Sequence, residues 1–354
     1  MMRFFAAFIT SFMLIFPALS SDIESTSADV LGAVSEYYVK ETPVADTAVN
    51  MVLGLKSLDS GINVIKSNNE LLLLQNGLLI GKYIEPQTIS GWAKFIDFAA
   101  HTFALNSGAV RNMSKEKLPE VMISHALEKL DKYSYYDSKS KNKGQQAKTK
   151  IPQIIITSEY YKDDSPYEIS DRDGYLTIVI ESFKNGTTEH IRNTVEKFQT
   201  AFSNSFKGII IDLRNNQGGT LLEAVNSADL FLDGGKIADI KGRSIISKQE
   251  YFADSKQIAH HIPIVIIVNK LTASSAELFA AALRENGRAA IIGEQSYGKA
   301  SVQARILLSN SDELVITWAG FLTPKGRNLE HTGLAPDIIK SYNHYETAKQ
   351  LLNR

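Results

Sequence analysis

The stretch IPIVIIVNKLTASSAELFAAALRENGRAAIIG, residues 262–293, decides the fold that the sequence predicts. It opens with an apolar run rich in β-branched residues, Ile262–Val268, which is typical of a strand buried on both faces. An amphipathic helix is predicted next. Its apolar face comprises Ala276, Phe279, Ala280 and Leu283. A second strand, Ala289–Ile292, completes a strand–helix–strand unit.

The same alternation of strands and helices extends in both directions along the chain. The further strands are predicted at Tyr175–Ile180, Gly208–Asp212, Ala300–Leu307 and Leu314–Trp318. The further helices are predicted at Thr188–Phe202 and Leu221–Leu232. Strands that alternate with helices predict an α/β core, in which helices pack against a mostly parallel sheet. We place this core at residues 173–354.

The residues that precede the core are predicted to form a mainly helical region, 22–136, that contains one β-hairpin. The hairpin covers Glu70–Tyr83, where two apolar runs flank Asn76-Gly77, the dipeptide favoured in tight hairpin turns. Residues 137–172 are predicted to be a linker or loop, because Ser138–Lys150 contains five Lys and has no apolar periodicity.

The first 21 residues have the pattern of a secretory signal peptide. A single basic residue, Arg3, precedes an apolar run, and small residues follow near Ser20. The pattern predicts an exported protein, which is periplasmic if the source is a Gram-negative bacterium. The alternative is an uncleaved segment that anchors the protein in a membrane. No later segment of the sequence is long and apolar enough to cross a bilayer.

Composition and charge exclude several classes of function. The chain has 38 Lys and Arg against 39 Asp and Glu, a balance that predicts no nucleic-acid binding. The absence of Cys rules out a thiol nucleophile, a disulfide and a Cys-ligated zinc. Residues 293–300 nearly match a phosphate-binding loop but end in Ala300 and lead into a strand, so nucleotide hydrolysis is not expected. No metal or organic cofactor is predicted.

The junction between the buried strand and the helix carries the most informative residues. Ser274 lies at the predicted helix N-terminus, where a serine serves either as a helix cap or as a nucleophile beside free backbone N–H groups. Lys299 and Gln303 are four residues apart and therefore share one face of an extended chain. Gly218-Gly219 forms a turn after another buried strand and can present N–H groups to an oxyanion.

These motifs, in this order, resemble the C-terminal processing peptidases, also called tail-specific proteases, over about half of the chain. The matching pieces are GIIIDLRNNQGG, VNKLTASSAELFAAALRENGRAAIIGEQSYGKASVQ and LTPKGRNLEHTGLAPDI. In that family a serine precedes x-x-Glu, a lysine follows 25 residues later, and a glutamine lies four residues beyond. The resemblance therefore implies Ser274 as nucleophile, Lys299 as general base and Gln303 as the residue that orients the lysine.

The resemblance also implies the oxyanion hole, the core fold and the kind of partner. The oxyanion donors would be the backbone N–H groups of Gly218 and Ser275, with Gly219 as a further candidate. The core would be crotonase-like. The partners would be protein or peptide substrates, together with an adaptor or a second copy of the chain. Family members commonly carry a PDZ domain, for which residues 137–172 leave no room, so capture of a substrate tail by that module is not expected.

Other interpretations remain open from the residues alone. A non-catalytic binding or scaffold protein on the same fold, or an esterase acting on small acyl groups, would also preserve this sequence pattern in part. Glu277 is read as a first-turn acid that complements the helix dipole, and Asp212 as a turn or hydrogen-bonding residue. His331 lies in a loop-like stretch, and no partner at a supporting spacing favours a catalytic role for it.

Overall fold

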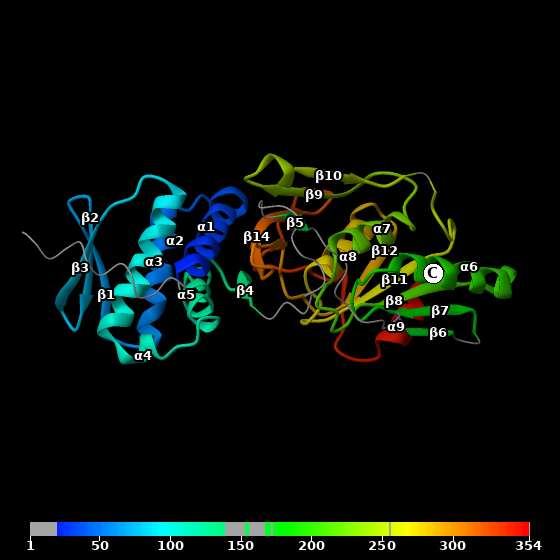
Figure 1. Cartoon of the computed structure of the whole chain (residues 1–354). Coiled ribbons are helices and arrows are strands. Elements are labelled where there is room, and N and C mark those ends of the chain that lie inside the picture. The colour runs from blue at the N-terminus through cyan, green and yellow to red at the C-terminus, as the bar shows by residue number, and fades with distance from the viewer. Residues whose placement is uncertain (1–19, 139–152, 156–166, 171–172, 255, 354) are drawn as a thin grey trace, which may run out of the picture. The chain divides into compact units, whose positions relative to one another are not determined.

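The computed structural model describes residues 20–138, 153–155, 167–170, 173–254 and 256–353 (Figure 1). The chain divides into two compact units. The first comprises the residues up to 155 together with 303–317, and the second comprises 156–302 and 318–354. All but the last two residues of the predicted signal segment lie outside the described part. Within the described part, no helix combines the length and apolar character needed to span a membrane.

The first unit is built on helices around an apolar core, with a three-stranded antiparallel sheet of order β1-β2-β3. The helices are α1 (Ser20–Tyr37), α2 (Val44–Leu53), α3 (Ile89–Asn106), α4 (Gly108–Arg111) and α5 (Lys117–Glu128). The strands of the small sheet are β1 (Ile62–Ser67), β2 (Glu70–Gln75) and β3 (Leu78–Ile84). The predicted hairpin is confirmed: Asn76 and Gly77 both have positive φ, as the tight turn between β2 and β3 requires.

The second unit contains a six-stranded sheet of order β15-β12-β11-β8-β7-β6. The strands are β6 (Tyr167–Ser170), β7 (Tyr175–Val179), β8 (Gly208–Asp212), β11 (Ile264–Val268), β12 (Ala289–Gly293) and β15 (Ile338–Ile339). The pairs from β7 to β15 are parallel, and only β6 runs antiparallel to its neighbour β7. The predicted mostly parallel sheet is confirmed.

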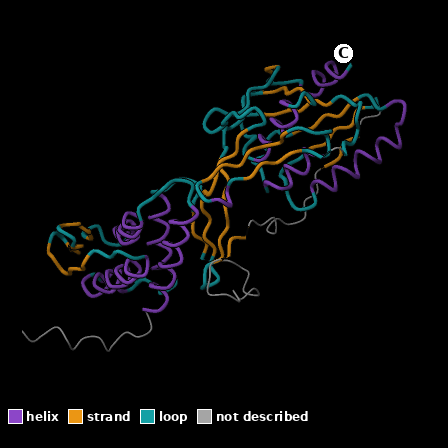
Figure 2. Tube along the Cα trace, turned by 90° about the horizontal axis from the view of Figure 1, so that it is seen from above, coloured by secondary structure: helices purple, strands orange, loops and turns teal. Residues whose placement is uncertain are grey.

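Helices cover both faces of this sheet (Figure 2). They are α6 (Thr187–Phe202), α7 (Leu221–Asp229), α8 (Ser275–Glu285) and α9 (His344–Leu352). Helix α9 packs with Ala348 and Leu352 against one face of the sheet. That face presents Ile210, Val265, Ile267 and Ile292. Because successive strand residues point to opposite faces, the alternate residues Ile209, Ile211 and Ile266 face the helices on the other side.

A second sheet has the strand order β10-β9-β14-β13-β5, and β4 also pairs with β14. Its strands are β4 (Tyr135–Asp137), β5 (Gln153–Ile155), β9 (Lys236–Gly242), β10 (Gln249–Phe252), β13 (Ser301–Leu307) and β14 (Glu313–Leu322). Strand β14 extends beyond the predicted Leu314–Trp318, and helix α7 ends at Asp229, before the predicted Leu232. Strand β5 and strand β6 lie inside the stretch predicted as a linker: β5 pairs with the distant β13, and β6 pairs with β7, the next strand along the chain.

The docking of α9 on the sheet can be tested with Leu352→Ala. The Leu352 side chain fills the space left by Gly208, whose Cβ, if it had one, would lie 2.8 Å from Leu352 Cδ1. Truncation should lower the free energy of unfolding by about 2 kcal/mol, measured by urea denaturation, because it leaves a cavity against the sheet. Gln350→Ala, on the exposed side of the same helix, should change it by less than about 0.5 kcal/mol. Equal losses in the two variants would contradict this docking.

Candidate active site

Three loops of the second unit follow neighbouring parallel strands and therefore leave the same edge of the sheet. Residues 213–220 follow β8, residues 269–274 follow β11, and residues 294–300 follow β12. The predicted site residues Gly218, Ser274 and Lys299 lie one on each loop. The carboxyl edge of a parallel sheet is where open α/β folds place their ligand sites.

Ser274 occupies a strained strand-to-helix turn. It is the N-cap residue of α8 and has φ 57° and ψ −124°, a conformation that costs a non-glycine residue about 1–3 kcal/mol. Ser274 is half-buried, whereas the neighbouring Ser275 is buried. A sharp turn of this kind holds a serine hydroxyl at the rim of a sheet. The sequence did not reveal the strain, because the flanking residues are Ala273 and Ser275 rather than glycine.

Side-chain and backbone hydrogen bonds join the loop after β8 to the loop after β11. Asn215 and Asn269 pair reciprocally: Asn269 Oδ1 accepts from the Asn215 N–H at 3.0 Å, and Asn269 Nδ2 donates to Asn215 Oδ1 at 2.9 Å. The Ala273 N–H donates to the Asn216 carbonyl at 2.8 Å. These bonds fix the glycine turn relative to Ser274.

The glycine turn lies directly against Ser274. Gly218 and Gly219 have φ values of 111° and 144°, which other residues rarely adopt. A Cβ on Gly218 would lie 2.9 Å from Ser274 Cβ, and one on Gly219 would lie 2.1 Å from the Phe183 carbonyl oxygen. Only glycine therefore fits at these two positions. In this structure the Gly218 N–H donates to Asn216 Oδ1 at 2.8 Å.

A buried carboxylate connects the Ser274 turn to the lysine loop. Glu277 is 0% exposed. Its Oε2 accepts the backbone N–H groups of Ser274 and Lys299, both at 2.9 Å. Its Oε1 accepts the Gly298 N–H at 2.9 Å and the Ser296 hydroxyl. Burial raises the pKa of Glu277, and these hydrogen bonds oppose the shift. The sequence indicated only a helix-dipole role for Glu277, since its partners lie up to 22 residues away.

The structure places the predicted site residues of the second unit on three neighbouring loops. Lys299 is half-buried in the turn after Gly298, and the carboxylate that holds its backbone also holds that of Ser274. Gln303 belongs to the first unit, on β13, where its side-chain amide donates to Thr317 Oγ1 at 3.3 Å. The His331 side chain is 78% exposed.

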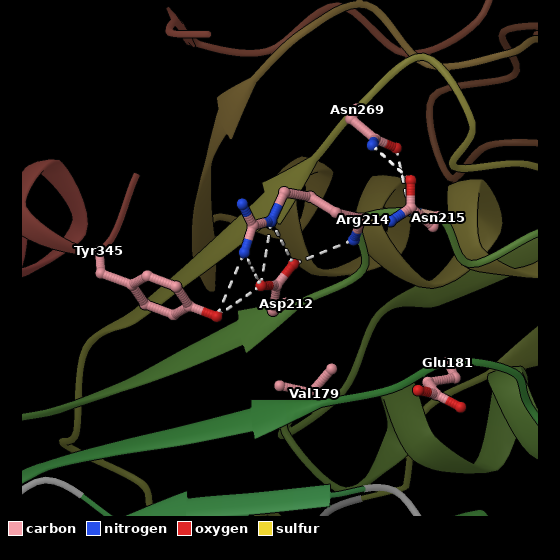
Figure 3. A pocket seen from close by; sticks show the side chains of 7 residues that line it. All are labelled: Val179, Glu181, Asp212, Arg214, Asn215, Asn269 and Tyr345. Atoms are coloured by element: carbon pink, nitrogen blue, oxygen red, sulfur yellow. Dashed lines mark hydrogen bonds and ion pairs between the residues drawn. The ribbon is translucent and has the colours of Figure 1, made fainter. Parts of the chain in front are cut away.

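A pocket of about 580 Å³ opens at the carboxyl ends of β7, β8 and β11 (Figure 3). It is lined by Val179, Glu181, Asp212, Arg214, Asn215, Asn269 and Tyr345. Buried Asp212 Oδ2 accepts from Arg214 Nη2 at 2.5 Å and from the Tyr345 hydroxyl at 2.7 Å. Burial and this bond to Asp212 raise the pKa of Tyr345 to about 12. The predicted hydrogen-bonding role of Asp212 is confirmed: it ties α9 to the turn that carries Gly218.

Within the described ranges, no three His, Asp or Glu side chains are grouped closely enough to hold a metal ion.

The strain at Ser274 predicts a difference in stability between two variants, which can be measured without an activity assay. Glycine adopts positive φ at little cost, whereas alanine keeps the strain of serine. Ser274→Gly should therefore melt at a higher temperature than Ser274→Ala, with a free-energy difference of about 1 kcal/mol or more. The same pair of substitutions at exposed Ser25, in the regular helix α1, should show the reverse order, because glycine destabilises a helix relative to alanine. A Ser274→Gly protein that is less stable than Ser274→Ala would contradict the strained turn.

Comparison with known proteins finds relatives of the region that holds this site. Residues 174–340 match the profile of peptidase family S41. The carboxy-terminal-processing protease of Bartonella bacilliformis is 33% identical over 174 residues, which is 49% of this chain and 40% of that protein. The chloroplastic carboxyl-terminal-processing peptidase 2 of Arabidopsis thaliana is 34% identical over 183 residues, which is 51% of this chain and 34% of that protein. The chain thus spans less than half the length of these two relatives.

Among solved structures, a lipoprotein from Streptococcus agalactiae aligns over 71% of this chain and 87% of its own, with a TM-score of 0.52 and 19% identity. That likeness shows the fold alone. The family match covers all three loops described above, from Gly218 to Lys299. The resemblance predicted from the motifs is confirmed: residues 174–340 match peptidase family S41, and both relatives are named as carboxy-terminal-processing peptidases.

Proposed function

We propose that the chain is a serine endopeptidase that cleaves protein or peptide substrates through Ser274 and Lys299. The observation that carries the proposal is the placement of Ser274. It sits in a strained turn against a glycine turn, and Glu277 holds its backbone together with that of the lysine loop. A helix cap needs neither the strain nor the second loop. The family match supports the same reaction class.

In the proposed reaction, the Lys299 amine accepts the hydroxyl proton of Ser274 while the serine oxygen attacks the peptide carbonyl carbon. The carbonyl electron pair moves to the oxygen, and N–H groups at the site stabilise the charge that develops there. The lysine proton then passes to the leaving amine, and water releases the acyl group from Ser274. Gln303 is proposed to orient Lys299, as the resemblance implies.

Exposed apolar side chains near the site support a polypeptide substrate rather than a small acyl ester. Leu271 precedes Ser274 by three residues and is 46% exposed. Tyr297 precedes Lys299 by two residues and is 50% exposed, and its N–H donates to the Thr272 carbonyl. Leu222 follows Gly219 by three residues and is 45% exposed. Each of the three loops thus carries, or leads into, one apolar side chain that could contact substrate residues beside the scissile bond.

Covalent labelling with an activated-ester probe tests the nucleophile and the base together. The wild-type protein should acquire one acyl group, located by mass spectrometry on Ser274. Ser274→Ala should not be labelled. Lys299→Arg should acylate at least about 10²-fold more slowly, because arginine keeps its charge and cannot accept a proton. Lys325→Arg, at an exposed lysine of the same unit, is the matched control and should acylate at the wild-type rate.

Two results would contradict the proposal. Labelling of Ser274→Ala at the wild-type rate would remove Ser274 as the nucleophile, and wild-type acylation in Lys299→Arg would remove lysine as the base. A wild-type protein that is folded and binds peptides but is never acylated would favour a scaffold on the same fold.

A further inference from the structure

The hydroxyl of Ser275 is a buried polar group that takes no part in the reaction proposed above. The residue is 4% exposed, and its Oγ has no hydrogen-bond partner among the described residues. An unpaired buried hydroxyl costs about 1–3 kcal/mol relative to one with a partner. Such groups are few in folded proteins, and each calls for a physical reason.

The position of the Ser275 hydroxyl gives a physical reason for a polar group without a partner. Ser275 is the first residue of α8, directly after Ser274. A Cβ built on Gly218 would lie 3.1 Å from Ser275 Oγ and 2.9 Å from Ser274 Cβ. The hydroxyl therefore lies where the glycine turn meets the serine turn, against the position that a side chain on Gly218 would occupy.

The other hydrogen-bond donors around Ser274 indicate what the Ser275 hydroxyl can do. The Gly218 N–H, expected from the family resemblance to bind an oxyanion, is engaged by Asn216 Oδ1 at 2.8 Å. The backbone N–H of Ser275 lies in the first turn of α8, where N–H groups have no acceptor within the helix. With one expected donor engaged, a hydroxyl donor beside Ser274 would complete the set that a developing negative charge requires.

We propose that the Ser275 hydroxyl donates a hydrogen bond to the carbonyl oxygen of the substrate as Ser274 attacks it. The inference rests on the proposed function. The new bond joins Ser274 Oγ to the carbonyl carbon, the π electron pair moves to the oxygen, and the Ser274 proton goes to Lys299. Ser275 forms no covalent bond and keeps its proton. Its hydroxyl, which has no partner among the described residues, gains one when the charge develops.

A packing role for Ser275 makes different predictions from a donor role. If the side chain only fills the space beside Gly218, alanine does so as well, and acylation is unchanged. If the hydroxyl is a donor, alanine removes an interaction made in the transition state and lowers kcat and kcat/KM equally. In both cases alanine should not destabilise the protein, because it deletes an unsatisfied group.

The experiment compares acylation of wild type and Ser275→Ala by an activated ester, with melting temperature measured on the same samples. We expect Ser275→Ala to acylate on the order of 10²-fold more slowly, with KM unchanged and a melting temperature equal to or above that of wild type. Thr47→Val is the matched control. Thr47, in α2, has a second buried hydroxyl without a partner, so its loss should leave acylation unchanged and stability equal or higher.

Two outcomes would overturn the inference. A Ser275→Ala protein that acylates at the wild-type rate has no donor at this position. A slow variant that also melts at a lower temperature shows that the hydroxyl has a structural partner instead. Failure of the proposed function would look different, because the wild-type protein itself would then not be acylated at Ser274.

Discussion

The site depends on one buried carboxylate. Glu277 accepts backbone N–H groups from Ser274 on one side and from Gly298 and Lys299 on the other, and it also holds the Ser296 hydroxyl. Charge-assisted hydrogen bonds of this kind are about twice as strong as neutral ones. They offset part of the cost of burying the charge, and they connect two loops that a helix and a strand separate in the sequence. The backbone positions of Ser274 and Lys299 therefore depend on the same group.

The strain at Ser274 is tolerated because its surroundings determine it from several directions. The Ser274 N–H is held by Glu277, the preceding Ala273 N–H is held by the Asn216 carbonyl, and Gly218 lies directly against Ser274. A disfavoured backbone conformation persists only where neighbouring contacts fix it, and such conformations cluster at functional sites. The cost of this turn is met by the packing of the parallel sheet and α8 beneath it.

Much of the fold could be predicted from local patterns. The buried strands Gly208–Asp212 and Ile264–Val268 are unbroken β-branched runs, and Asn76-Gly77 marks its hairpin directly. The ends of elements were harder to place, because β14 continues to Leu322 through pairing with β9, a contact between distant segments. The assignment of residues 303–317 to the first unit depends on similar long-range pairing, with β4 and β5.

In the site, the candidate residues followed from the family resemblance, whereas their connections could not be predicted. No glycine in the sequence indicates the strained turn at Ser274. Nothing in the sequence shows that Glu277 accepts hydrogen bonds from Gly298 and Lys299. The link from α9 to the turn after β8, through Tyr345 and Asp212, spans 133 residues and is visible only in the structure.

The account is tested most directly by the acylation rate of Glu277→Gln. Each carboxylate oxygen of Glu277 accepts two donors, so either orientation of a glutamine amide sets an NH₂ group against two of them. We predict a folded protein, less stable than wild type, whose acylation at Ser274 falls on the order of 10²-fold or more. The matched variant is Glu223→Gln, a first-turn glutamate of α7 that accepts the N–H groups of Gly186 and Thr188, and it should acylate normally. Wild-type acylation in folded Glu277→Gln would contradict the claim that this carboxylate positions the site.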